Sequence, residues 1–141
     1  MSRESTGGAA RKVCLMIDAP VSWGELADKI TILEIKSERI QDEAKRLNVE
    51  KELRLLREKL AIAPSSSALS GLVDALRAVN LELWVIEDDI RDCERDKDFG
   101  ARFIELARSV YFKNDRRAAL KKEINLLLGS GIIEEKSYRA Y

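Results

Sequence analysis

Apolar residues recur at alternating intervals of three and four along most of this chain, the pattern of amphipathic helices that pack along a narrow seam. The longest unbroken run consists of Leu69, Leu72, Leu76, Val79, Leu83, Ile86, Ile90 and Cys93. A similar run begins after Ser22 and Glu25, which have the form of a capping box, with the hydroxyl accepting from a backbone amide and the carboxylate reaching back. Before it, Val13–Ile17 alternates apolar and other residues and predicts a short extended segment.

The first helix has two candidate ends, at Gln41–Asp42 or near Asn48, and the apolar pattern then continues to Leu60. Pro64–Ser67 predicts a loop with a helix N-cap at its end. A last helix is expected from Phe99 to Leu128, before Gly129–Gly131. Four helices with short connections predict an all-α, antiparallel bundle with a coiled-coil-like seam.

Outside the helices we expect a disordered tail over residues 1–12, with a single helical-bundle domain over residues 13–141. The last ten residues are expected to dock as a tail through three side chains, Ile132, Ile133 and Tyr138.

Composition excludes several kinds of function. The 141 residues carry 25 basic and 25 acidic side chains, so there is no basic excess for a sequence-independent grip on nucleic acid. No run approaches the roughly 18 apolar residues of a membrane span, and the start lacks a secretory core, so a cytoplasmic protein is expected. His is absent and the cysteines Cys14 and Cys93 lie far apart, so we expect no metal site and no cofactor.

Charge is divided between the last two predicted helices. The second half of the third helix is acidic, and the fourth is basic. Folding back near Lys97 would place Asn80 beside Asn114. The charges then either pair across the hairpin, or leave basic residues free to face a ligand.

The stretch Lys113–Arg117 is polar around a full helical turn, so a polar side chain must face the interior there. Lys36–Arg39 has the same property and predicts a matching layer. The candidate ligand-binding residues are Asn80, Arg108, Tyr111, Asn114, Arg117 and Lys121. Two interpretations stay open: a buried asparagine pair that fixes helix register, or a pocket for an anionic small molecule held by Arg side chains.

Two catalytic alternatives have weaker support. Glu34 with Glu38, and Asp88 with Asp92, are spaced four apart like magnesium ligands, but the spacing does not match the pattern of helical nucleoside triphosphate pyrophosphatases. A chorismate-mutase-like site from Lys29, Arg108 and Arg117 rests on residue types alone. We therefore assign no catalytic residue. We expect Trp23 and Trp84 to pack in the core, and the alternative for each is the aromatic wall of a pocket.

A resemblance to a known family rests on five stretches: Ser22–Lys36, Leu83–Ile90, Asp98–Tyr111, Asn114–Lys121 and Gly129–Tyr138. With them the chain resembles, over nearly its whole length after Pro20, a family of small, uncharacterised bacterial helical proteins that is known as a domain of unknown function. The resemblance implies a first helix that ends near Gln41–Asp42. It implies no activity, cofactor or catalytic residue.

The function that we predict is a non-enzymatic interaction or assembly protein that self-associates as a homo-oligomer or binds a protein partner, since a continuous seam on long helices exceeds what one short chain covers. The alternative is a small-ligand-binding module or enzyme that holds an anionic ligand, a nucleotide or activated sugar, through the basic polar layer on the fourth helix.

Overall fold

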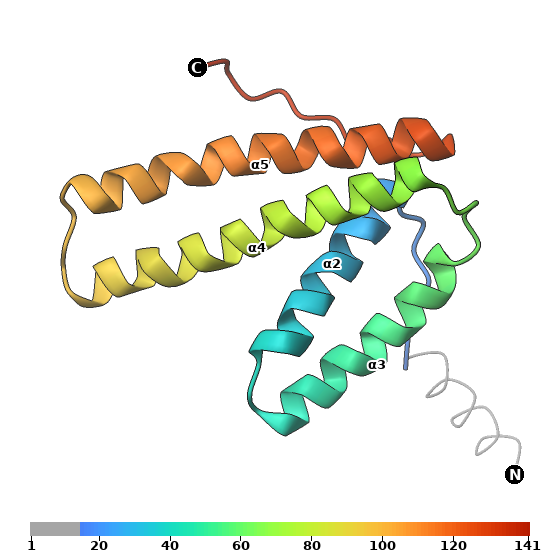
Figure 1. Ribbon diagram of the computed structural model, residues 1–141, viewed down its shortest axis with the longest axis horizontal. Helices are drawn as coiled ribbons and strands as arrows, with labels where there is room; N and C mark the ends of the chain where they lie inside the picture. Colours follow the sequence, from blue (N-terminus) through green and yellow to red (C-terminus); the bar gives the residue numbers. More distant parts are fainter. Residues whose placement is uncertain (1–14) are drawn as a thin grey trace, which may run out of the picture.

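The computed structural model describes residues 15–141 and contains four helices there: α2 (Trp23–Arg39), α3 (Glu43–Leu60), α4 (Ser67–Arg95) and α5 (Ala101–Leu128) (Figure 1). No strand occurs in this range, so the predicted all-α class with four main helices is confirmed. Residues 16–22 form neither helix nor strand. The disordered tail expected at residues 1–12 lies outside the described residues, as does the start of the extended segment.

Side-chain caps begin three of the helices. Ser22 accepts from the Glu25 amide, Asp42 from the Lys45 amide and Ser66 from the Leu69 amide, each over 3.1 Å. The break at Gln41–Asp42 is therefore confirmed, and Asn48 lies inside α3. The second half of the predicted capping box is wrong, because the Glu25 carboxylate binds Lys121 on α5 instead.

The core has two parts, and α2 contributes to both. One cluster joins α2, α4 and α5 through Ala27, Leu69, Leu76, Val79, Leu120 and Ile124. The other joins α2 and α3 through Leu26, Ile30, Leu33 and Leu53. Trp23 packs against both clusters, as expected for a core residue. The first helix of the described fold is thus its central element.

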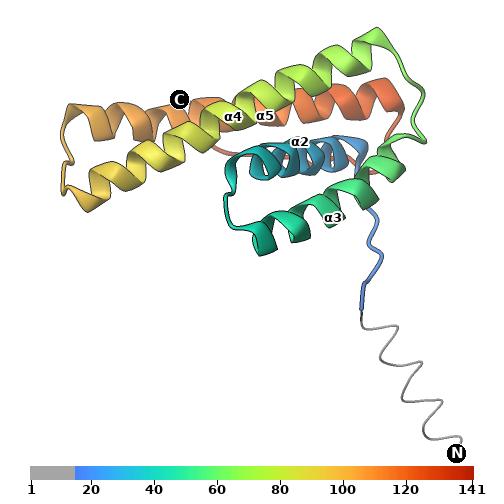
Figure 2. The same ribbon diagram turned by 60° about the horizontal axis from the view of Figure 1, so that its bottom comes forward.

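The hairpin of α4 and α5 extends well past the end of α2, as Figures 1 and 2 show. We call its projecting part, residues 83–113, the arm. Its seam residues are only half-buried: Leu83, Ile86, Ile90, Phe103, Leu106 and Val110. Cys93, at 1% exposure, is the one buried side chain of the arm. The same seam is closed in the other half of the hairpin, where α2 covers both helices.

Ion pairs across the hairpin are fewer than the charge pattern suggested. In the described range, Asp89 pairs with Arg102 over 3.7 Å and Glu82 pairs with Lys113. Other acidic residues of α4 pair with basic residues close in sequence: Glu87 with Arg91, Asp92 with Arg95 and Glu94 with Lys97. Several basic side chains of α5, Arg108 and Arg117 among them, therefore have no carboxylate partner within residues 15–141.

The C-terminal tail, residues 131–141, runs back along α5 (Figure 1). It contacts α5 at two places. Glu134 lies 3.5 Å from the Lys121 ammonium, and at the end of the tail the Tyr141 hydroxyl donates to Asp115 while its ring packs 5.2 Å from the Tyr111 ring, between centroids. The three predicted anchors are wrong, because Ile132, Ile133 and Tyr138 are 46%, 40% and 81% exposed. The tail docks through an aromatic and polar contact rather than through apolar burial.

Candidate functional site

A buried hydrogen-bonded group links α2 to α4. The Asn80 side-chain amide donates to the Asp28 carboxylate over 2.9 Å and to the Thr31 hydroxyl over 2.8 Å. The Thr31 hydroxyl in turn donates to the Asp28 backbone carbonyl over 2.8 Å. Because the Asn80 nitrogen takes both acceptors on α2, its carbonyl oxygen must point the other way, toward α5.

A buried lysine extends this group to α5. The Lys121 ammonium lies 2.7 Å from Glu25, 3.7 Å from Asp28 and 3.5 Å from Glu134 of the tail. Burial lowers the pKa of Lys121, but the hydrogen bond to Glu25 and the charges of Asp28 and Glu25 outweigh it, so the pKa is raised. Lys121 is therefore charged and neutralises a carboxylate that would otherwise be buried alone.

Close approach of backbones completes the contact between α2 and α5. The Gly24 amide donates to the Asn125 side-chain carbonyl over 2.7 Å, and both residues are buried. A side chain at Gly24 would collide with the Lys121 backbone carbonyl. The polar layer then consists of Asp28, Thr31, Asn80, Arg117, Lys121 and Asn125. No buried side-chain N or O atom in residues 15–141 lacks a partner, so the layer is internally satisfied.

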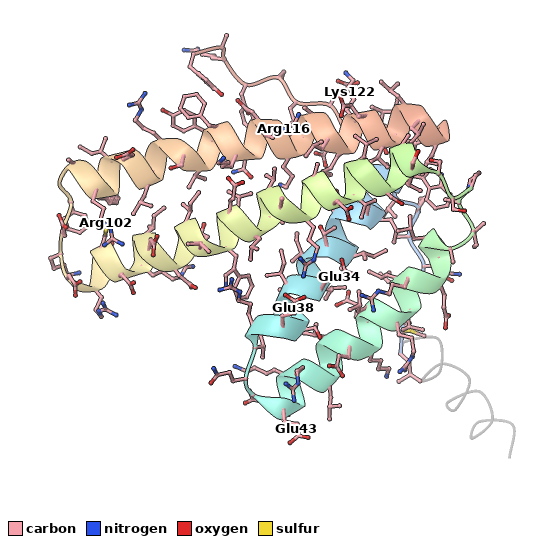
Figure 3. The ribbon with its side chains drawn as sticks, viewed as in Figure 1. Glu34, Glu38, Glu43, Arg102, Arg116 and Lys122 are labelled. Atoms are coloured by element: carbon pink, nitrogen blue, oxygen red, sulfur yellow. The ribbon has the colours of Figure 1, made fainter. Side chains whose placement is uncertain are left out.

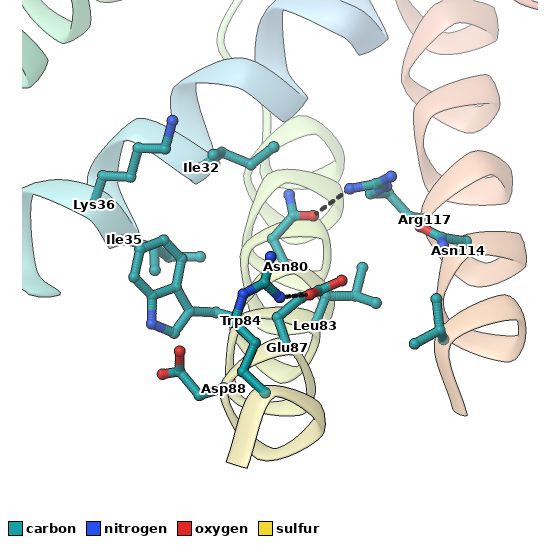
Figure 4. Close-up of a pocket in the computed structure, with 12 residues that line it drawn as sticks. Ile32, Ile35, Lys36, Asn80, Leu83, Trp84, Glu87, Asp88, Asn114 and Arg117 are labelled. Carbon is teal, nitrogen blue, oxygen red and sulfur yellow. Dashed lines mark hydrogen bonds and ion pairs between the residues drawn. The ribbon is translucent and has the colours of Figure 1, made fainter. Parts of the chain in front are cut away.

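Arg117 differs from the other members of this layer. Its guanidinium donates to the Asn80 carbonyl oxygen over 3.4 Å, drawn as a dashed line in Figure 4. Among the described residues, no carboxylate lies within 4.0 Å of it, although the residue is half-buried. A partly desolvated guanidinium with one long hydrogen bond retains donors for an external group.

Arg117 borders a cleft of about 590 Å³ where α2 ends and the arm begins, which we call the junction cleft (Figure 4). Its apolar lining is Ile32, Ile35, Leu83, Trp84 and Val110, and its polar lining is Lys36, Asn80, Glu87, Asp88, Arg91, Asn114 and Arg117. This volume falls within the range of roughly 300–1,000 Å³ that is typical of small-molecule sites. Trp84, which we expected in the core, forms a wall of this cleft.

The candidate residues from the sequence fall into different places. Asn80, Asn114 and Arg117 share the junction cleft, and Lys121 is buried in the neighbouring ion cluster. Asn80 contacts Arg117 rather than an Asn114 side chain, so the expected asparagine pair does not form. Tyr111 lies outside, beside Tyr141.

Arg108 is exposed and contributes to neither the cleft nor an ion pair in the described range. The structure thus separates it from Asn80, Asn114 and Arg117, the candidates that line the cleft.

Sequence reasoning missed Asp28 and Thr31, the α2 half of the layer. A signal was present, because Gly24, Asp28 and Thr31 follow one another at intervals of four and three, a polar stripe beside the apolar one. We had instead expected the match from Lys36–Arg39. Of these, Lys36 lines the cleft, whereas Ser37 hydrogen-bonds Glu50 at the surface.

The residues of the two catalytic alternatives are not assembled into sites. Glu34 and Glu38 of α2 (Figure 3) bind arginines, Glu34 pairing with Arg57 over 2.7 Å and Glu38 pairing with Arg77. No group of three or more His, Cys, Asp or Glu side chains in residues 15–141 is placed to hold a metal ion. Lys29 pairs with Glu52 of α3 over 2.9 Å, away from Arg117.

No helix within residues 15–141 is long and apolar enough to cross a membrane. Residues 17–141 match a family model described as "Family of unknown function (DUF6165)". Neither a curated protein nor a solved structure matches the chain. The family match agrees with the resemblance that the sequence motifs indicate, and it brings no activity with it.

Proposed function

Since the chain belongs to DUF6165, a family of unknown function, we propose its role from its geometry: it is a non-enzymatic assembly protein that self-associates through the arm. The observation that carries this proposal is the half-buried seam of residues 83–113. Two copies would pack their arms together and complete a four-helix bundle that one chain leaves open.

The arm lacks the third helix that closes the seam elsewhere. Leu76 and Ile124 are fully buried where α2 lies against α4 and α5, whereas the seam residues of the arm, Ile90 and Leu106 among them, remain half-exposed. Burial of apolar surface contributes about 25 cal/mol per Å². A second arm that packs along this seam would therefore stabilise both copies. The simplest closed arrangement is a twofold dimer, in which both copies use the same surface.

Charge favours a second copy of this chain as the occupant. The arm has an acidic side on α4, with Glu87, Asp88, Asp89, Asp92 and Glu94, and exposed cations on α5. Arg108 is exposed, and no carboxylate in the described range lies within 4.0 Å of it. In a twofold pair, the acidic α4 of one arm can lie beside the basic α5 of the other, so the surface is complementary to itself.

The test is the mass of the full chain in solution, measured by light scattering and by native mass spectrometry over a series of protein concentrations. We expect a dimer with twice the 16.0 kDa of the chain. Leu106→Glu should give a folded monomer, because the α2–α4–α5 cluster holds the base of the hairpin independently of the arm. Leu126→Glu makes the same change at a 63% exposed position outside the arm and should leave the dimer intact.

A second pair of variants tests the charge argument without touching the seam. Arg108→Glu should weaken the dimer, whereas Arg54→Glu, at an exposed position of α3, should not. Circular dichroism checks that each variant remains helical. A wild-type chain that stays monomeric at every concentration would refute the proposal. It would also be refuted if the control variants weakened the dimer as much as the arm variants do.

A further inference from the structure

We propose that the junction cleft is a binding site for a phosphate monoester with a ring-shaped body, the chemistry shared by nucleoside monophosphates and sugar phosphates. The phosphate would lie between Lys36 and Arg117, and the ring would lie on Trp84 (Figure 4). Every residue that this site uses comes from one chain, so a monomer can bind the ligand; Leu83 and Val110 line the cleft and also belong to the seam of the arm.

The charge of the cleft identifies the anionic end. Lys36 of α2 and Arg117 of α5 reach it from different helices, with the neutral Asn80 side chain between them in Figure 4. Among residues 15–141, neither cation has a carboxylate within 4.0 Å. The cleft is also lined by Glu87, which pairs with Arg91, and by Asp88, so it holds three cations and two carboxylates. A phosphate monoester carries a charge of about −1.5 to −2 near neutral pH, and the unpaired Lys36 and Arg117 attract it. Its oxygens also accept the paired donors of a guanidinium.

The buried polar layer positions Arg117 for this contact. Asp28 and Thr31 take both donors of the Asn80 amide, so its oxygen faces the Arg117 guanidinium at 3.4 Å. That single neutral acceptor orients the guanidinium without neutralising it. Binding therefore needs little reordering of a long side chain, which is a large part of the cost of ligand binding.

The rest of the cleft fits the body of such a compound. Trp84 and Leu83 of α4, with Ile32 and Ile35 of α2, form an apolar wall beside the cations. An indole face stacks well on a base or on the apolar face of a sugar. Asp88 lies beyond Trp84 and pairs with no cation within 4.0 Å in the described range, so its carboxylate can accept from the hydroxyl groups of a ribose or hexose.

Arg117 also borders a second space of about 800 Å³ under the C-terminal tail. That space is lined by Lys136 and Arg139 together with Asp115, and the tail residues that line it are exposed. The junction cleft is preferred because every residue that lines it lies on a helix, whereas the second space is lined in part by the exposed tail. Substitutions can distinguish the two spaces, because Lys36 lines only the first and Arg139 lines only the second.

The experiment is isothermal titration of the full-length protein at low salt in phosphate-free buffer. The probes are uridine monophosphate, glucose 1-phosphate, uridine and inorganic phosphate. We expect at least one of the two monoesters to bind, uridine not to bind, and inorganic phosphate to bind more weakly than the monoester. Lys36→Gln and Arg117→Gln should each weaken binding about tenfold or more. Trp84→Leu should lower the affinity for the monoester and leave the affinity for inorganic phosphate unchanged.

Two controls keep the test specific. Lys29→Gln removes an exposed cation from the same helix, and Arg139→Gln removes one from the tail space; neither should change the affinity. The proposal fails if neither monoester binds, if Arg117→Gln binds as well as wild type, or if inorganic phosphate binds as tightly as its esters. It also fails if Arg139→Gln abolishes binding while Lys36→Gln retains it, because the ligand then occupies the tail space.

Discussion

Asn80 of α4 donates its side-chain amide to the Asp28 carboxylate of α2 over 2.9 Å, in the interior of the bundle. Asp28 also lies 3.7 Å from the Lys121 ammonium of α5, so this one carboxylate contacts both neighbouring helices. A buried group that must satisfy two partners permits few alternative alignments of the three helices. The layer therefore fixes the register of α2 against the α4–α5 hairpin.

Removing the Asn80 amide should test this role. Asn80→Ala leaves the buried Asp28 carboxylate and the Thr31 hydroxyl with one partner fewer, so we expect the free energy of unfolding to fall by about 2 kcal/mol. Urea denaturation followed by circular dichroism measures the change. Asn48→Ala, on the exposed surface of α3, should stay within about 0.5 kcal/mol of wild type. Equal effects of the two substitutions would show that the layer contributes nothing specific.

Lys121 should give the fold a dependence on alkaline pH. Burial lowers its pKa, but the hydrogen bond to Glu25 and the charge of Asp28 raise it more, and the net pKa lies above the ordinary 10.5. A group whose folded pKa is raised stabilises the protein fully below its unfolded pKa and loses that contribution as the pH rises through the folded value. Lys121→Met should therefore cost about 3 kcal/mol at neutral pH, since it leaves Asp28 buried without a cation.

The pH series separates this charge effect from lost packing. The difference in unfolding free energy between wild type and Lys121→Met should be constant from neutral pH up to about 10.5 and shrink above it. Lys122→Met is the matched control, because that ammonium lies at the surface 4.0 Å from Glu135. Lys122→Met should lower the free energy of unfolding by at most about 1 kcal/mol. A difference that does not change above pH 10.5 would assign the effect of Lys121→Met to packing.

Cys93 offers a probe of the arm. Its thiol is 1% exposed although the seam around it is half-open. In a Cys14→Ser background, we expect an aromatic disulfide reagent to modify the native thiol about a hundredfold more slowly than the unfolded chain, because the arm must open locally first. Val85→Glu, at a 42% exposed position of the arm, should leave the rate unchanged. Modification at the unfolded rate would mean that the arm is not formed in solution.

Sequence periodicity predicted the helices because it depends only on local geometry. The run from Leu69 to Cys93 gave α4, and Gly129, at a φ of 65°, ends α5 as expected. The end of α2 was harder, since the apolar pattern continues across Asp42 and only the capping side chain distinguishes the break. The expected bond from the Glu25 carboxylate to the start of its own helix does not form, because the carboxylate binds Lys121 instead, a residue distant in sequence.

The site was predictable in part for the same reason. Asn114 and Lys121 lie three residues before and four after Arg117, so all three share one helix face, and the structure places them toward the interior. Arg108 lies nine residues before Arg117, which at 100° per residue is the opposite face. Helical geometry alone could therefore have excluded Arg108 from the candidate site residues. The partners Asp28 and Thr31 depend on how α2 is aligned with α4, which periodicity does not encode.

Gly24 shows how closely α2 and α5 approach, and it allows a paired test. A Cβ there would lie 2.4 Å from the Lys121 carbonyl oxygen and 2.9 Å from its carbon, backbone atoms that cannot rotate away. Gly24→Ala must therefore separate the helices and stretch the bond from its amide to Asn125, at a cost of about 2–3 kcal/mol. Chemical denaturation measures it.

Gly71 of α4 provides the control for the same chemical change. Nothing lies within 4 Å of a Cβ at that position, so Gly71→Ala meets no obstacle in the folded state. Alanine in a helix is favoured over glycine by about 0.5–1 kcal/mol, and this substitution should stabilise the protein by that amount. The two variants should thus shift the denaturation midpoint in opposite directions. A gain in stability for both would mean that α2 does not approach α5 this closely, and the polar layer would then lack the contact that brings Glu25 and Asp28 to Lys121.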